Sequence, residues 1–167
     1  MRIFFGAIMA AVLMFSSVKA DTLRPIELDP IDHHEAELVI VGTDGEELRY
    51  SPVLLEGLQT YRITTTTPWR AEPADFDGVL LTDLLRRSGL ETIGELRVTA
   101  ENEFSAVLPR ALWETVPVLV ATRVNGQALT RRERGPIQFI IPSDEFEASP
   151  VASEAHLVWM AARIEPE

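Results

Sequence analysis

The pattern of apolar and polar positions along the chain predicts mostly short β-strands. Residues 37–41 and 47–50 are rich in β-favouring side chains and flank the turn dipeptide Asp44-Gly45, which predicts a hairpin. Similar runs recur over the rest of the chain, and several of them end at proline or glycine. They predict further strands at residues 60–67, 95–100, 104–108, 117–124, 137–141 and 156–164.

Helical signals are fewer and shorter. Ser51-Pro52 combines an N-cap residue with proline at the first helical position, which predicts a short helix at residues 53–58. Leucines at helical spacing predict a second helix at residues 79–87, entered through a turn at Asp77-Gly78. Residues 112–116 predict one further helical turn. The mixture predicts an α+β fold in which strands dominate.

The chain divides into three segments by composition. Residues 1–20 form a leader, and residues 21–35, which contain two prolines, predict an extended N-terminal lead-in. The remaining residues, 36–167, have the length of one ordinary domain, which can bury a core without covalent crosslinks.

The leader has the three zones of a secretory signal peptide. Arg2 precedes an apolar run over residues 3–15, and small residues lead to Ala20. The run is shorter than the roughly 20 residues that a membrane-spanning helix needs. We therefore expect cleavage after Ala20, a periplasmic or secreted protein, and no membrane insertion after cleavage. No arginine pair precedes the apolar run, which indicates export of an unfolded chain.

Charge and cysteine content restrict the partners and the chemistry. The chain has 26 acidic and 15 basic residues and a formal net charge of −11. Such an acidic surface argues against nucleic acid and anionic membranes as partners. The sequence contains no cysteine, so it can form neither a disulfide nor a thiolate ligand for a metal.

The order of motifs resembles the sulfite-oxidase-type oxidoreductase molybdopterin-binding domain. The resemblance rests on residues 61–69, 76–85, 118–126 and 134–142, and it extends over residues 36–165. It implies a mostly β fold with short helices, a molybdopterin cofactor if the family activity is retained, and oxidoreductase chemistry.

One position departs from the catalytic members of that family, in which a cysteine thiolate ligates molybdenum. Matching the segment from Tyr61 to Trp69 places Thr65 at the position of this cysteine. A threonine hydroxyl lacks the soft sulfur that such metal sites use. Export of an unfolded chain also conflicts with a cofactor loaded in the cytoplasm. We therefore expect no bound cofactor and no catalytic residue.

The resemblance suggests a vestigial pocket at this place. Its candidate walls are Thr65, Thr67, Trp69, Arg131, Arg132 and Arg134. Arginine forks suit carboxylates, phosphates and sulfur oxyacids, so the arginine loop predicts an anion clamp. The alternative is a solvated turn that balances nearby acids. No metal site is expected, because the adjacent His33 and His34 would point in opposite directions in an extended segment.

Three functions fit the sequence. The first is a periplasmic, non-catalytic relative that binds a small, anionic ligand or a membrane-bound signalling protein through the pocket. The second is a molybdopterin-dependent oxidoreductase of the sulfite oxidase type. The third is a periplasmic structural or assembly factor that uses an exposed sheet edge.

Overall fold

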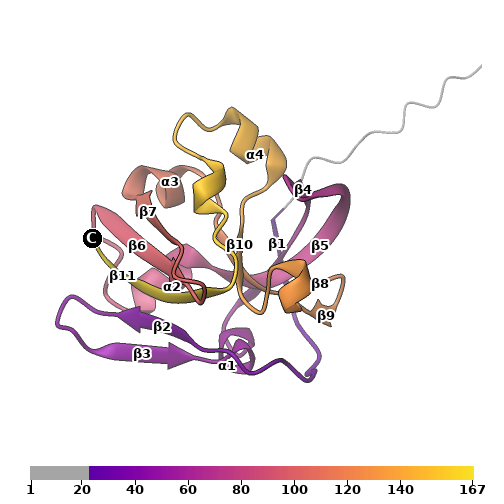
Figure 1. Cartoon of the computed structure of the whole chain (residues 1–167), viewed down its shortest axis with the longest axis horizontal. Helices are drawn as coiled ribbons and strands as arrows, with labels where there is room; N and C mark the ends of the chain where they lie inside the picture. The colour runs from indigo at the N-terminus through magenta and orange to yellow at the C-terminus, as the bar shows by residue number, and fades with distance from the viewer. Residues whose placement is uncertain (1–22) are drawn as a thin grey trace, which may run out of the picture.

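The computed structural model describes residues 23–167, which form two β-sheets with short helices (Figure 1). The predicted signal peptide lies outside the described residues and stays a prediction. The mostly β, α+β architecture expected from the sequence is confirmed. No helix among the described residues is long and apolar enough to cross a membrane.

The first sheet is antiparallel throughout, in the order β1-β4-β5-β8-β10, with β9 paired to β8. The segment predicted as an extended lead-in, residues 21–35, contains β1, which is an edge strand of this sheet. The strands of this sheet are β1 (Arg24–Ile26), β4 (Thr60–Thr67), β5 (Arg70–Leu80), β8 (Leu119–Val124), β9 (Gln127–Ala128) and β10 (Gln138–Ile140).

The second sheet has the order β3-β2-β11-β6-β7, and only the β11–β2 pair is parallel. Its strands are β2 (Leu38–Val41), β3 (Glu47–Tyr50), β6 (Glu95–Ala100), β7 (Ser105–Pro109) and β11 (Ala161–Pro166). The helices are α1 (Pro52–Glu56), α2 (Leu81–Arg87), α3 (Arg110–Thr115) and α4 (Ser143–Ala148), with 3₁₀ turns η1 (Arg131–Glu133) and η2 (Glu154–His156).

Strand β8 is buried along its whole length because it has a core on each face. Val120 packs in the larger cluster, which includes Leu38 and Ile40 of the second sheet and the leucines of α2. Its neighbours Leu119 and Ala121 point to the other face and join a smaller cluster with Phe76. Successive side chains of a strand point to opposite faces, and both faces of β8 meet a core. This is why successive apolar residues can belong to one strand.

The structure corrects two expectations from the sequence. Asp77-Gly78 is not a turn, because both residues lie within β5 and the helix begins only at Leu81. The closing strand begins at Ala161 rather than at residue 156, since η2 and the left-handed Met160, with φ of 54°, precede it. The acidic segment that follows Pro142 contains α4.

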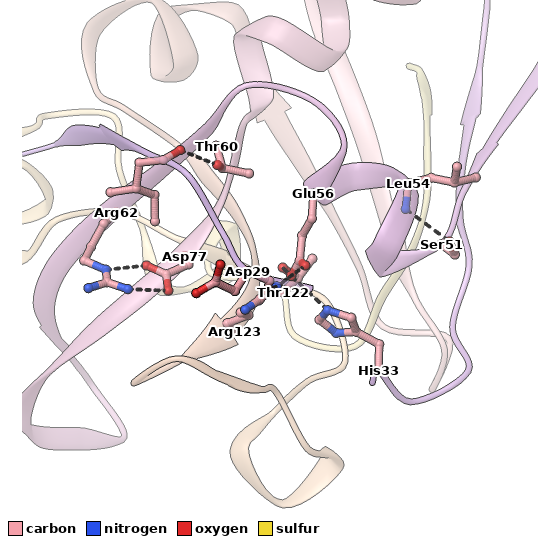
Figure 2. Close-up of polar contacts among 11 residues, drawn as sticks. Asp29, His33, Ser51, Leu54, Glu56, Thr60, Arg62, Asp77, Thr122 and Arg123 are labelled. Carbon is pink, nitrogen blue, oxygen red and sulfur yellow. Dashed lines mark hydrogen bonds and ion pairs between the residues drawn. The ribbon is translucent and has the colours of Figure 1, made fainter. Parts of the chain in front are cut away.

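A buried polar cluster connects the segment that contains Asp29 and His33 to the rest of the domain (Figure 2). The Glu56 carboxylate accepts hydrogen bonds from Arg123 Nη2 at 2.5 Å, Arg123 Nε at 2.8 Å and Thr122 Oγ1 at 2.6 Å. His33 Nε2 lies 3.0 Å from Glu56 Oε1, and Arg123 Nη2 also donates to Asp29 O at 2.8 Å. His33 therefore lies within this buried polar cluster, beside Glu56.

Candidate functional site

A cavity of about 180 Å³ opens over the smaller core, and we call it the anion pocket after the ligand class expected from the sequence. Phe76, Val124 and Leu129 of that core form its apolar floor. Its polar wall comes from the end of β4, the start of β5, the η1 loop and β10. The polar and aromatic lining residues are Thr67, Trp69, Arg70, Arg132, Glu133, Arg134 and Gln138.

The η1 loop is held in place by a capping box. Thr130 Oγ1 accepts a hydrogen bond from Glu133 N at 3.3 Å, and the Glu133 carboxylate accepts one from Thr130 N at 3.3 Å. The loop then closes through Gly135 N, which donates to Thr130 O at 2.8 Å. The arginines of this loop are therefore carried by a fixed backbone.

Arg134 lies between two tryptophans that come from different parts of the sequence. Its Cζ is 4.7 Å from the Trp69 ring centroid and 5.3 Å from that of Trp159, both within cation–π range. Arg134 Nε is buried and has no hydrogen-bond partner among the described residues. The indole faces hold the guanidinium in place without neutralising it, and Arg134 is one of the residues that line the anion pocket.

The residues that line the anion pocket have a net positive charge, whereas the whole chain has a net negative charge. Three arginines and one glutamate line it, whereas the full chain has a net charge of −11. The Glu133 carboxylate is already paired, since Thr130 Oγ1 donates to its Oε2 at 2.8 Å and Arg70 Nη2 lies 3.8 Å from its Oε1. Arg132 and Arg134 have no ion-pair partner within residues 23–167 and supply the uncompensated positive charge.

The structure brings together four of the six residues that the sequence proposed for this pocket, namely Thr67, Trp69, Arg132 and Arg134. Arg131 points away, with a 62% exposed side chain that pairs with Glu101. Thr65 is 1% exposed and is not part of the pocket lining. Arg131 and Thr65 are therefore not among the residues that line the anion pocket.

Thr65 instead connects β4 to the start of α4. Its Oγ1 accepts a hydrogen bond from Ser143 N at 2.8 Å and donates one to Thr66 O at 3.2 Å. The side chain alternates away from Thr64, whose Oγ1 donates to Asp75 Oδ1 at 2.7 Å. The position that resembles a metal ligand is thus occupied by a side chain that joins two backbone segments.

We expect Thr65→Val to lower the free energy of unfolding by about 1–2 kcal/mol, because it keeps the shape of the side chain and removes its hydrogen bonds. Thr65→Ser keeps the hydroxyl and serves as the matched control, with a smaller loss. Urea unfolding of the three proteins measures the difference. Equal losses for valine and serine would show that the hydroxyl contributes nothing.

A second cavity, of about 300 Å³, adjoins the anion pocket through the shared residue Thr67. Ile141, Phe146 and Leu157 make its interior apolar, while Glu147 and Glu154 are its charged residues. This cavity has no arginine in its lining, so the two neighbouring cavities differ in charge.

Sequence reasoning missed Gln138 and Trp159 as parts of the site. Gln138 is 2% exposed, lines the anion pocket and forms an isolated bridge with Trp159. No local signal marks either residue, because both reach the site through pairing of distant segments. Within residues 23–167, no group of three His, Cys, Asp or Glu side chains lies close enough to hold a metal ion.

Comparison with protein families gives one match that covers more than half of the chain. The family model described as the oxidoreductase molybdopterin-binding domain matches residues 55–149, from α1 to the end of α4. The matched region contains β4, β5, the η1 loop and Gln138, and therefore most of the anion pocket. A search of curated proteins finds no match to this sequence. The chain belongs to the oxidoreductase molybdopterin-binding domain family.

Proposed function

We propose that this protein binds a small carboxylate, phosphate or sulfur oxyacid in the anion pocket and carries out no molybdenum chemistry. The observation that carries the proposal is the Arg134 side chain, which is stacked between Trp69 and Trp159 and has an unpartnered, buried Nε. A guanidinium held in this way loses little side-chain freedom when it binds an anion, so most of the interaction energy contributes to affinity.

The size and lining of the pocket support a small ligand. Its volume of about 180 Å³ lies below the roughly 300–1,000 Å³ of sites for drug-sized molecules. Arg132 and Arg134 offer charged donors to the anion, and Phe76 and Val124 exclude water from its other side. Charge-assisted hydrogen bonds are strengthened in such partly apolar surroundings.

Two features argue against a protein-ligated molybdenum centre. The residue at the metal-ligand position is Thr65, whose hydroxyl binds Ser143 N, and the sequence contains no cysteine to replace it. The cavity beside Thr66 and Thr67 has Glu147 and Glu154 as its charged residues, which would repel a pterin phosphate. The residues present therefore do not fit the cofactor that the family name implies.

Calorimetric titration with acetate, phosphate, sulfite and sulfate tests the proposed function. We expect at least one anion to bind, and we expect Arg134→Gln to weaken it by about 10- to 100-fold, since a hydrogen bond to a charged group contributes roughly 1.5–3 kcal/mol. Arg131→Gln is the matched control, because Arg131 belongs to the same loop but pairs with Glu101 outside the pocket.

Two outcomes would contradict the proposal. Failure of all four anions to bind, or equal weakening by the Arg131 and Arg134 variants, would remove the anion pocket as the binding site. Near-stoichiometric molybdenum in protein purified from its native host would favour a molybdopterin-dependent oxidoreductase instead. Bound molybdenum and the fluorescence of the oxidised pterin measure this directly.

We place this binding function in the periplasm, where the loaded protein would act on a membrane-bound signalling protein. The proposal is supported by the signal-peptide pattern of residues 1–20. Amino-terminal sequencing of protein from the periplasmic fraction should give Asp21 as the first residue. Membrane pull-downs with and without the bound anion test the partner, and loss of capture by Arg134→Gln would connect the partner to the pocket.

A further inference from the structure

Strand β3 forms an open edge of the five-stranded sheet (Figure 1). It pairs with β2 on one side through the register Val39–Arg49, Ile40–Leu48 and Val41–Glu47. Among the described strands, none pairs with its other side. An edge of this kind exposes a row of backbone N–H and C=O groups that can pair with another strand.

The backbone groups that face outward can be identified from the hairpin. Gly42 N donates to Glu46 O at 2.8 Å, so this pair is hydrogen-bonded, and antiparallel pairs alternate from there. The pair of Ile40 and Leu48 is then hydrogen-bonded as well. Glu47 and Arg49 consequently direct their N–H and C=O groups away from β2, toward the open side.

The side chains of β3 are complementary to a second copy of the same strand. In an antiparallel pair centred on Leu48, Glu47 of each copy lies opposite Arg49 of the other, and the two Leu48 side chains meet on the two-fold axis. This register uses the outward backbone groups of Glu47 and Arg49, so hydrogen bonding and charge require the same alignment. We propose that the protein forms a symmetric homodimer through antiparallel pairing of β3.

Exposed apolar side chains concentrate next to this edge. Among the described residues, six large hydrophobic side chains are exposed, and three of them are Leu48, Val53 and Leu54, at 40%, 59% and 57%. They lie on β3 and on α1, which follows it directly. Leu48 is also the outer end of a row of core residues that crosses the sheet through Ile40 and Ile164. A second copy would extend this row across the two-fold axis.

The other outer strands are less suited to pairing. Strand β1 has three residues with proline in the middle, which removes a backbone donor. Strand β10 is bridged to Trp159 through Gln138. Strand β7 ends at Pro109, and none of its five residues is charged, so it has no charge pair of its own that could set a register. A self-complementary partner therefore fits β3 best.

Charge-biased variants test both the dimer and its register. Glu47→Arg leaves two cations on the edge, and Arg49→Glu leaves two anions, so each variant alone would place like charges opposite each other. We expect each to weaken dimerisation by about tenfold or more, and an equimolar mixture of the two to restore a dimer. Analytical ultracentrifugation of the native protein, each variant and the mixture measures the association.

Phe104→Glu is the matched control, because Phe104 is 42% exposed and lies away from β3, and we expect it to leave the dimer unchanged. Circular dichroism checks that the variants fold, which is expected because Glu47 and Arg49 are exposed and lose only surface ion pairs, with each other and with Arg163 and Glu37. A native protein that stays monomeric at about 100 μM, well above the micromolar range of a stable dimer, would overturn the proposal. A mixture that stays monomeric while the native protein dimerises would overturn the register and the assignment to β3.

Discussion

Replacing Gly78 by alanine is expected to lower the free energy of unfolding by roughly 4 kcal/mol or more, which places it among the exceptional single substitutions. A Cβ atom at this position would lie 2.1 Å from Val120 O and 2.7 Å from Ala121 Cα. Both atoms belong to the backbone of β8, so no side chain can rotate to relieve the overlap. The two central strands would have to separate, and both cores pack against β8.

Gly94→Ala is the matched control for this prediction. No atom lies within 4 Å of the Cβ position at Gly94, and its backbone is not left-handed. There alanine should be neutral or raise the stability by about 0.4–1 kcal/mol, because it restricts the unfolded chain. Urea unfolding and the soluble yield of both variants provide the measurement. A Gly78→Ala protein as stable as the native one would mean that β5 and β8 do not approach this closely.

The same glycine explains one limit of the sequence analysis. Asp77-Gly78 is a common turn dipeptide, and local chemistry alone predicts a turn there. In the structure, Asp77 accepts hydrogen bonds from Arg62 Nε at 2.6 Å and Nη2 at 2.8 Å across the β4–β5 pair, and Gly78 permits the close approach of β8. Both requirements come from strands that are distant in sequence.

The family resemblance and the apolar alternation predicted most of the fold, because each strand carries its own pattern. The site was predicted only in part. Thr67, Trp69, Arg132 and Arg134 follow from the position of their segments in the family pattern. The alternation of β4 turns Thr65 toward Ser143, and the ion pair with Glu101 turns Arg131 outward. Such side-chain directions depend on tertiary partners, which the sequence does not display.

The buried cluster around Glu56 was also beyond prediction, since Glu56 and Arg123 are separated by 67 positions. We expect Glu56→Gln to lower the free energy of unfolding by about 3 kcal/mol. The Arg123 side chain is 4% exposed, and the substitution leaves its charge buried without its main counter-charge. The Asp29 carbonyl still accepts one hydrogen bond from Arg123, which keeps the expected loss at the lower end of the range for a broken buried pair.

The exposed pair of Arg110 and Glu114 supplies the control. Its side chains are 42% and 51% exposed, so Glu114→Gln should cost less than about 0.5 kcal/mol. Arg123→Met combined with Glu56→Gln should cost clearly less than the sum of the two single variants, because the double variant leaves no buried charge unpaired. Additive losses would show that the two residues contribute independently.

The pH dependence of the Glu56→Gln effect follows from the pKa of Glu56. Burial raises this pKa, but hydrogen bonds from Arg123, Thr122 and His33 outweigh burial and hold it below its usual 4.5. A lowered pKa means that the ionised carboxylate stabilises the fold above pH 4.5, and that this contribution is lost as the pH falls through the lowered value. The stability difference between the native protein and Glu56→Gln should therefore be constant near neutral pH and shrink in acid. A difference that grows as the pH falls would mean that Glu56 is protonated in the folded protein and that the cluster is not held by its charge.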